Sequence, residues 1–402
     1  MADSVRQPGT YTFFERIRAH PLVTGFYLAV LVGIPVFPCF YKLDHNYMSV
    51  LLYVEIYMIL ALGLNIVVGM TGLLDLGYAM FLSTGAVVCA LCLVLTHAPA
   101  DASTGEAARY MLPVGTTDVS EGSHPFHFPG GLFVILFLAG SVCALLGVLR
   151  GIPTLKLTGD YYAIVTLGLA EILFLFYLNT ESLTGGAFGI KLLLSDSPEM
   201  FGEKLYWDTP FFYYFTFFLL VLTIATMLRL QNSRLGRAWA AIKLDETAAR
   251  SSGVNVSKYK LIAFAISGFV GGIGGALMTI WMGLAAVKDL DVWQSILILC
   301  CVVLGGMGSI PGTLLGTFIL ISLGEVLREP LPLIELRVPN EARFLIYGLI
   351  LVFLMRFRPQ GLLPLVREGR SPKEDEVKQI ARISTPLFTL STETAHSEEG
   401  DE

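Results

Sequence analysis

The sequence predicts an all-α polytopic membrane protein with about ten transmembrane helices. Hydrophobic residues make up 54% of the 402 residues and charged residues only 15%, whereas soluble domains carry about 25% charged residues. The apolar residues are grouped in runs of roughly transmembrane length, some of which are short enough to suit tilted, broken or re-entrant helices. The expected spans are residues 21–41, 47–69, 76–97, 131–150, 157–178, 210–230, 260–283, 291–307, 310–328 and 341–357.

Lys and Arg are distributed unevenly among the connections between these spans. Cytoplasmic loops of membrane proteins are enriched in these residues. If the chain has ten spans and starts in the cytoplasm, 19 of its 27 Lys and Arg residues lie on the cytoplasmic side. We therefore expect both termini in the cytoplasm, with residues 98–130 and 179–209 as external loops. On length alone, these two loops suit plain connections as well as a surface that receives a soluble partner.

One polar segment, residues 231–259, interrupts the apolar pattern. It reads either as a solvated loop whose basic residues follow the positive-inside rule, or as a short helix that seats in a groove of a partner. Around it, we expect a cytoplasmic N-terminal segment at residues 1–20 and a transmembrane domain at residues 21–364. Residues 365–402 are rich in acidic side chains and predict a disordered cytoplasmic tail.

Several acidic residues lie within or near the apolar runs, where a charge at a helix centre costs about 2.5–3.5 kcal/mol. These residues are Glu55, Asp75, Asp160, Glu171 and Glu325. Asp160 follows Gly159 at the start of a span and is expected to cap that helix. Glu171 lies eleven residues later, on nearly the same helix face. Asp160 and Glu171 therefore indicate either a cap plus an interhelical hydrogen bond, or a polar stripe along a pathway.

Glycines recur at every fourth position in two of the later spans. They form the pairs Gly268 and Gly272, and Gly271 and Gly275, and the series Gly308, Gly312 and Gly316. This spacing lets helix backbones approach closely in lipid. Close helix packing is the expected consequence. The functional alternative is that these helices line a narrow path or slide against each other during transport.

The sequence does not predict a metal site or covalent chemistry. All six cysteines lie in apolar runs, where a small polarizable side chain packs well. His124 and His127 lie three residues apart in an expected external loop, but a metal site needs further ligands. We find no nucleophile and base within the apolar runs, which disfavours an intramembrane enzyme. No nucleic-acid partner is predicted.

Six segments spread over residues 62–364 carry a family resemblance. They are LGLNIVVGMTGLLDLGYAMF (62–81), LTGDYYAIVTLGLAEI (157–172), SLTGGAFGI (182–190), SRLGRAWAAIKLDETAARSSGVNVSKYKLIAF (233–264), VVLGGMGSIPGTLLG (302–316) and RFRPQGLLP (356–364). Together and in this order, they resemble the membrane-spanning permease subunits of ABC importers for branched-chain amino acids, the LivM type. Permeases of urea and short-amide importers are close relatives. The resemblance implies a type II ABC importer-like permease in the bacterial inner membrane.

The resemblance implies that residues 231–259 contain the EAA-type loop that docks into a cleft on an ATPase subunit. The residues expected to form this docking surface are Arg237, Asp245, Glu246, Ala248, Ala249 and Gly253. Gly253 is expected to end a helix in a left-handed conformation. The chain contains no G-x-x-x-x-G-K-[ST] run. The implied ATP and Mg sites therefore lie on two partner ATPase subunits, and the chain itself is expected to hold no cofactor.

The resemblance also implies a second homologous permease subunit and a soluble binding protein that delivers a small-molecule substrate. Branched-chain or other neutral amino acids are the expected substrates, with urea, short amides and small organic acids as alternatives. The expected pathway residues are Thr71, Gly72, Asp75, Gly159, Asp160, Glu171, Thr184, Gly185 and Gly186. The Gly185 and Gly186 positions also suit a plain turn, which we favour.

The family commonly has a serine and a histidine around the LLDLGYAMF region, where this chain has Asp75 and Tyr78. This departure leaves the substrate open, since a carboxylate near the pathway favours a more polar or cationic ligand. From another class, an ion-coupled transporter would use intramembrane carboxylates to relay protons or bind sodium. Its candidate residues are Glu55, Asp160, Glu171 and Glu325.

Overall fold

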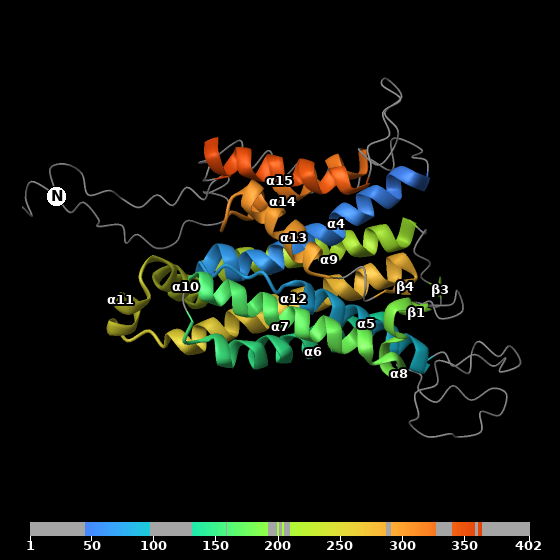
Figure 1. The fold of residues 1–402 in the computed structure, drawn as a ribbon, viewed down its shortest axis with the longest axis horizontal. Helices are drawn as coiled ribbons and strands as arrows, with labels where there is room; N and C mark the ends of the chain where they lie inside the picture. Colours follow the sequence, from blue (N-terminus) through green and yellow to red (C-terminus); the bar gives the residue numbers. More distant parts are fainter. Residues whose placement is uncertain are drawn as a thin grey trace, which may run out of the picture. The chain divides into compact units, whose positions relative to one another are not determined.

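The computed structural model describes residues 45–96, 131–157, 159–191, 199–200, 203–204, 210–286, 291–326, 340–357 and 361–363, all within the unit Met1–Pro364. Helices dominate this part of the chain, as the sequence predicts (Figure 1). In order they are α4 (His45–Asn65), the π-helix η2 (Ile66–Thr71), α5 (Ala79–Thr96), α6 (Gly131–Thr154), α7 (Asp160–Asn179), α8 (Glu181–Thr184), the 3₁₀-helix η4 (Gly186–Phe188), α9 (Pro210–Asn232), α10 (Arg234–Leu244), α11 (Glu246–Ser251), α12 (Val256–Met282), α13 (Val292–Gly305), α14 (Ile310–Val326) and α15 (Asn340–Phe357).

The expected spans agree with the observed helices wherever the structure describes them. Among the described residues, five helices are long and apolar enough to cross a membrane: Met48–Thr71, Leu132–Thr154, Asp160–Asn179, Phe212–Asn232 and Val256–Met282. Three shorter apolar helices are Ala79–Leu93, Val292–Gly305 and Ile310–Glu325. Some expectations concern segments outside the described residues, namely residues 1–20, 21–41, 98–130 and 365–402. The total of about ten spans therefore stays a prediction.

The glycines of α12 let this helix pack at backbone distance against two neighbours. A Cβ atom at Gly268 would lie 2.5 Å from the carbonyl oxygen of Cys143 in α6. A Cβ atom at Gly275 would collide with the carbonyl oxygen of Leu82 in α5. Close packing at these positions is confirmed, and it places α5 and α6 directly against α12.

The second glycine series joins α13 to α14, with one difference from the expectation. Gly312 and Gly316 of α14 face the backbone of Gly305 in α13 too closely for any Cβ atom. Gly308, in contrast, lies outside both helices, in the turn between them, at a φ of 92°. Residues 361–363 close the end of α13, because the amide of Leu362 donates to the carbonyl of residue 304 at 2.9 Å. This bond satisfies a helix-end carbonyl that would otherwise lack a partner.

Two short antiparallel strand pairs accompany the helices. Strand β1 (Ile190–Lys191) pairs with β4 (Leu284–Ala285), and β2 (Glu199–Met200) pairs with β3 (Glu203–Lys204). The pairing of β1 with β4 ties the segment after α7 to the end of α12. Figure 1 shows β1, β4 and α8 at one end of the helices, with α10 and α11 at the other.

A glycine substitution tests the backbone contact between α12 and α5. We expect Gly275→Ala to destabilise the detergent-solubilised protein by about 1–3 kcal/mol, the usual cost of an overpacked interior. The matched control is Gly168→Ala in α7, where a Cβ atom meets nothing within 4 Å. Thermal unfolding followed by tryptophan fluorescence measures both variants. Equal melting temperatures for the two variants would contradict the close contact.

Candidate functional site

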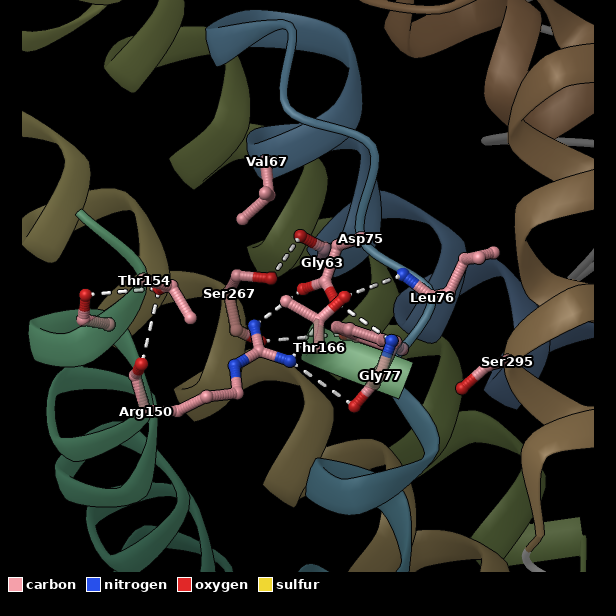
Figure 2. A network of polar contacts seen from close by, with 12 residues as sticks. Gly63, Val67, Asp75, Leu76, Gly77, Arg150, Thr154, Thr166, Ser267 and Ser295 are labelled. Carbon is pink, nitrogen blue, oxygen red and sulfur yellow. Dashed lines mark hydrogen bonds and ion pairs between the residues drawn. The ribbon is translucent and has the colours of Figure 1, made fainter. Parts of the chain in front are cut away.

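A buried ion pair lies at the centre of the first helix break. Asp75 belongs to the non-helical segment between η2 and α5, and Arg150 belongs to α6. Arg150 Nη1 donates to Asp75 Oδ1 at 3.0 Å and Nη2 donates to Oδ2 at 2.5 Å. The two side chains are 2% and 0% exposed. This two-pronged geometry fixes orientation as well as supplying charge compensation (Figure 2).

The same groups hold the backbone of the break. The amide of Gly77 donates to Asp75 Oδ1 at 2.9 Å, and Arg150 Nη1 also donates to the carbonyl of Gly77 at 3.3 Å. The amide of Leu76 donates to Thr166 Oγ1 of α7 at 3.4 Å. In Figure 2 the side chains of Arg150 from α6 and Thr166 from α7 point toward the non-helical segment that carries Asp75. Backbone groups that leave a helix inside a membrane protein need such partners.

Aromatic rings complete the environment of the guanidinium. The Arg150 Cζ atom lies 4.6 Å from the centre of the Phe81 ring and 5.9 Å from that of Phe264. These distances are those of cation–π contacts. Arg150 is one of the 19 Lys and Arg residues that the ten-span scheme places on the cytoplasmic side, but the structure buries its side chain within α6. The carboxylate of Asp75 is thus neutralised within the chain, which removes the basis for expecting a cationic ligand at this position.

The first helix break also includes η2, and it is touched by a second break, the turn between α13 and α14. The π-helix η2 ends at Gly72, which adopts a left-handed conformation with a φ of 78°. Thr71 Oγ1 donates to the carbonyl of Val67 at 2.7 Å. The amide of Gly308, in the turn between α13 and α14, donates to Asn65 Oδ1 at 2.8 Å. The two breaks are therefore one connected site, and irregular backbone of this kind marks the substrate sites of many transporters.

The polar segment at residues 231–259 forms two short helices with well-defined starts. Ser233 Oγ accepts from the amides of residues 235 and 236 at the start of α10. Asp245 Oδ1 accepts from the amides of Thr247 and Ala248 at 2.8 and 3.0 Å, which makes it the N-cap of α11. Asp245 thus has a structural role in addition to any contact with a partner.

The expected docking residues divide between two faces. Arg237, Asp245, Ala248 and Gly253 are exposed, whereas Ala249 is buried and Glu246 is half-buried. Glu246 Oε2 accepts from Lys260 Nζ at 2.7 Å, and its Oε1 accepts from Arg250 at 3.1 Å. The left-handed conformation expected for Gly253 is confirmed by its φ of 83°.

One exposed residue of this segment was missed in the sequence. Leu244 ends α10 and is 85% exposed, although it is apolar. The sequence feature that could have identified it is an apolar residue between two charged ones, Lys243 and Asp245, in a polar segment. Apolar side chains this exposed outside the lipid region are candidates for contact with another protein.

The remaining candidate residues lie along α7 and just beyond it. Asp160 is exposed in the first turn of α7, and Gly159 occupies the N-cap position, so the expected cap role of Asp160 is wrong. Glu171 is half-buried on the same helix.

The turn expected at residues 184–186 is confirmed. The amide of Gly186 donates to Thr184 Oγ1 at 3.2 Å, and Gly185 has a φ of 70°. This turn lies beyond the far end of α7, away from the helix breaks.

The structure thus brings Thr71, Gly72 and Asp75 together and leaves the other pathway candidates apart. The four carboxylates considered for ion coupling come from three helices: Glu55 from α4, Asp160 and Glu171 from α7, and Glu325 from α14. In the part of the chain that the structure describes, His, Cys, Asp and Glu side chains form no group of three that could hold a metal ion.

The buried ion pair makes a specific prediction about stability. We expect Asp75→Ala to lower the unfolding free energy by about 3–5 kcal/mol, because it leaves the Arg150 charge buried and uncompensated. The double change Asp75→Leu with Arg150→Met removes both charges and is expected to recover part of that loss. The apparent melting temperature in detergent measures these differences.

The control for this prediction breaks an exposed pair of the same chemistry. Arg250→Ala removes the contact to Glu246, in which the arginine side chain is 67% exposed. An exposed pair contributes no more than about 1 kcal/mol. If Asp75→Ala proves as mild as Arg250→Ala, the ion pair does not anchor the helix break.

Comparison with known proteins identifies relatives over most of the chain. The family described as "Branched-chain amino acid transport system / permease component" matches residues 46–355. The high-affinity branched-chain amino acid transport system permease protein LivM of Salmonella typhimurium is 35% identical over 345 residues, which cover 80% of this chain and 71% of that protein. LivM of Escherichia coli strain K12 is 34% identical over the same lengths.

A more distant relative extends the match. The probable branched-chain amino acid transport permease protein LivM of Methanocaldococcus jannaschii is 24% identical over 349 residues, which cover 83% of this chain and 97% of that protein. No solved structure matches the chain significantly. The resemblance carried by the six sequence segments is thereby confirmed. The chain belongs to the family of permease components of branched-chain amino acid transport systems.

Proposed function

We propose that this chain is the substrate-translocating subunit of a binding-protein-dependent ABC importer for branched-chain or other neutral amino acids. The observation that carries the proposal is the similarity to two LivM permeases over 80% of the chain. The connected helix breaks around Asp75 and Gly308 support it, since broken helices provide polar backbone groups inside an apolar bundle. Because Arg150 compensates the charge of Asp75, this carboxylate gives no reason to prefer a cationic substrate.

The helices α10 and α11 supply the docking surface for an ATPase subunit. The two helices are held to the start of α12: Trp239 is fully buried and its Nε1 donates to the carbonyl of Tyr259 at 2.8 Å. Leu244 is an exposed apolar side chain that the exposed Asp245 follows directly, and Arg237 is exposed about two turns earlier in α10. An apolar anchor with a polar rim is the usual composition of a protein interface.

The assembly follows from this assignment. The end of the molecule that carries α10 and α11 faces the cytoplasm of a bacterium, together with both termini. Residues 98–130 and 179–209 then face outward and receive the soluble binding protein. A second homologous permease subunit and two ATPase subunits complete the importer, and ATP and Mg bind on the ATPase subunits. The acidic residues 365–402 form a cytoplasmic tail.

In this scheme the pathway opens alternately to the two sides of the membrane, and the ATPase subunits on the cytoplasmic side drive the change. When the ATPase subunits bind and hydrolyse ATP, they displace the docked helices α10 and α11. Thr71 and Gly72 end η2, where Gly72 lies against Lys243 of α10, and Asp75 follows in the next segment. Thr184, Gly185 and Gly186 belong to α8 and the turn after it, at the opposite end of the helices from α10 (Figure 1). We assign the first set to the inner part of the pathway and the second to a turn at its outer mouth.

The docking surface is tested by a charge placed on its apolar residue. We expect Leu244→Arg to abolish co-purification of the ATPase with the tagged chain in mild detergent, because it puts a charge where an apolar anchor must be desolvated. The matched control is Phe188→Arg, at the opposite end of the helices, since Phe188 is 87% exposed and also apolar. Retention of the ATPase by both variants would remove Leu244 from the interface.

The substrate and the energy source are tested together in liposomes. The complex purified through this chain is expected to take up leucine, isoleucine and valine only when ATP and the binding protein are present. Urea and acetamide, added as competitors, distinguish the alternative substrates. Uptake by the chain alone in response to a proton or sodium gradient would instead indicate the ion-coupled class, and neutralising Glu55 would then abolish it.

A further inference from the structure

Three distant parts of the chain meet beneath the last turn of α10. Lys243 Nζ donates to the carbonyl oxygen of Gly69 in the π-helix η2 at 2.7 Å. Gly69 in turn lies against Gly308, in the turn between α13 and α14. A single side chain of the polar segment therefore reaches the place where both helix breaks touch.

The contact between the two breaks leaves almost no free space. A Cβ atom at Gly69 would collide with the amide nitrogen of Gly308 and with Asn65 Oδ1. Asn65 Oδ1 accepts from the amide of Gly308 at 2.8 Å. Packed interiors transmit a displacement because they cannot compress. A shift of Gly69 must therefore shift the turn at Gly308 as well.

The bond from Lys243 is well suited to carry such a shift. Gly69 lies at the C-terminal end of the span Met48–Thr71, where the negative end of the helix dipole favours a cation. A bond from an ammonium group to a carbonyl is stronger than one between neutral groups. The stem of Lys243 also lies against Gly72, whose added Cβ atom would be only 3.0 Å from Lys243 Cγ.

The polar segment can transmit a displacement to Lys243 because its two helices are both bonded to α12. Trp239 of α10 is hydrogen-bonded to the backbone of α12 at Tyr259, and Glu246 of α11 is paired with the buried Lys260 of α12. The helices α10 and α11 and the start of α12 therefore form one body, to which Lys243 belongs. The π-helix that Lys243 holds is a type of helix distortion frequent at functional sites.

We infer that Lys243 is a positioning residue that couples movement of the docked helices α10 and α11 to the two helix breaks. This inference rests on the proposed function, because it requires an ATPase bound at α10 and α11. When the ATPase displaces these helices, Lys243 moves the carbonyl of Gly69, and the Gly69–Gly308 contact moves the turn between α13 and α14. Access to the pathway changes at both breaks in one step.

The test measures how much substrate moves for each ATP hydrolysed. In proteoliposomes that contain the whole complex and the binding protein, Lys243→Met keeps the aliphatic stem and removes the charge. We expect leucine uptake per ATP to fall about tenfold, within the range of coupling between two sites in one protein. ATPase co-purification is expected to stay as in the wild type. Lys243→Arg keeps a donor and is expected to restore most of the uptake.

The control is Lys258→Met, the same change at an exposed lysine in the first turns of α12. It is expected to leave uptake per ATP unchanged. The inference is overturned if Lys243→Met transports with the wild-type ratio, or if uptake, ATP hydrolysis and melting temperature fall in parallel at a constant ratio. If the wild-type chain binds no ATPase and shows no ATP-dependent uptake, the proposed function fails, and this inference fails with it.

Discussion

The bidentate pair between Asp75 and Arg150 is the interaction on which the arrangement of the first helices depends. A membrane interior offers no water to backbone groups that leave a helix, so the segment between η2 and α5 must be satisfied from within the protein. The pair supplies a carboxylate acceptor to the amide of Gly77 and a guanidinium donor to its carbonyl. It thereby allows a helix break around the buried Asp75 and Gly77, at the price of two charges that only each other can neutralise.

Glycine provides the second condition for this architecture. Side chains at the contact points of α12 with α5 and α6 would force the helices apart, and the same holds where Gly69 meets Gly308. Packing, and not hydrophobic attraction, holds helices together in lipid. The glycines thus bring the helices so close that a change in the position of one break displaces the other. The sequence left two interpretations of these glycines: close helix packing, or helices that line a path or slide during transport. The two are compatible, because a tight contact between helices transmits the movement of one helix to the other.

The polar segment between α9 and α12 links this interior to the surface. Its inward residues, such as Ala249 and the carboxylate of Glu246, fasten it to α12, while Leu244 and Arg237 remain available outside. This division explains why a segment that interrupts the apolar pattern is ordered and not merely a solvated connection. Family membership and this exposed surface point to the same role, that of a permease component driven by a partner.

The sequence by itself determined the membrane class, the positions of most described helices and the family, because apolar runs, turn glycines and contiguous segments are local features. Gly253 ended its helix as expected for the same reason. Only the tertiary structure decided that Asp75 pairs with Arg150, 75 residues away, and that Lys243 reaches Gly69. It also decided that Leu244 is exposed. These outcomes depend on which helix faces meet, and the residues that meet lie too far apart in the chain for any local pattern to join them.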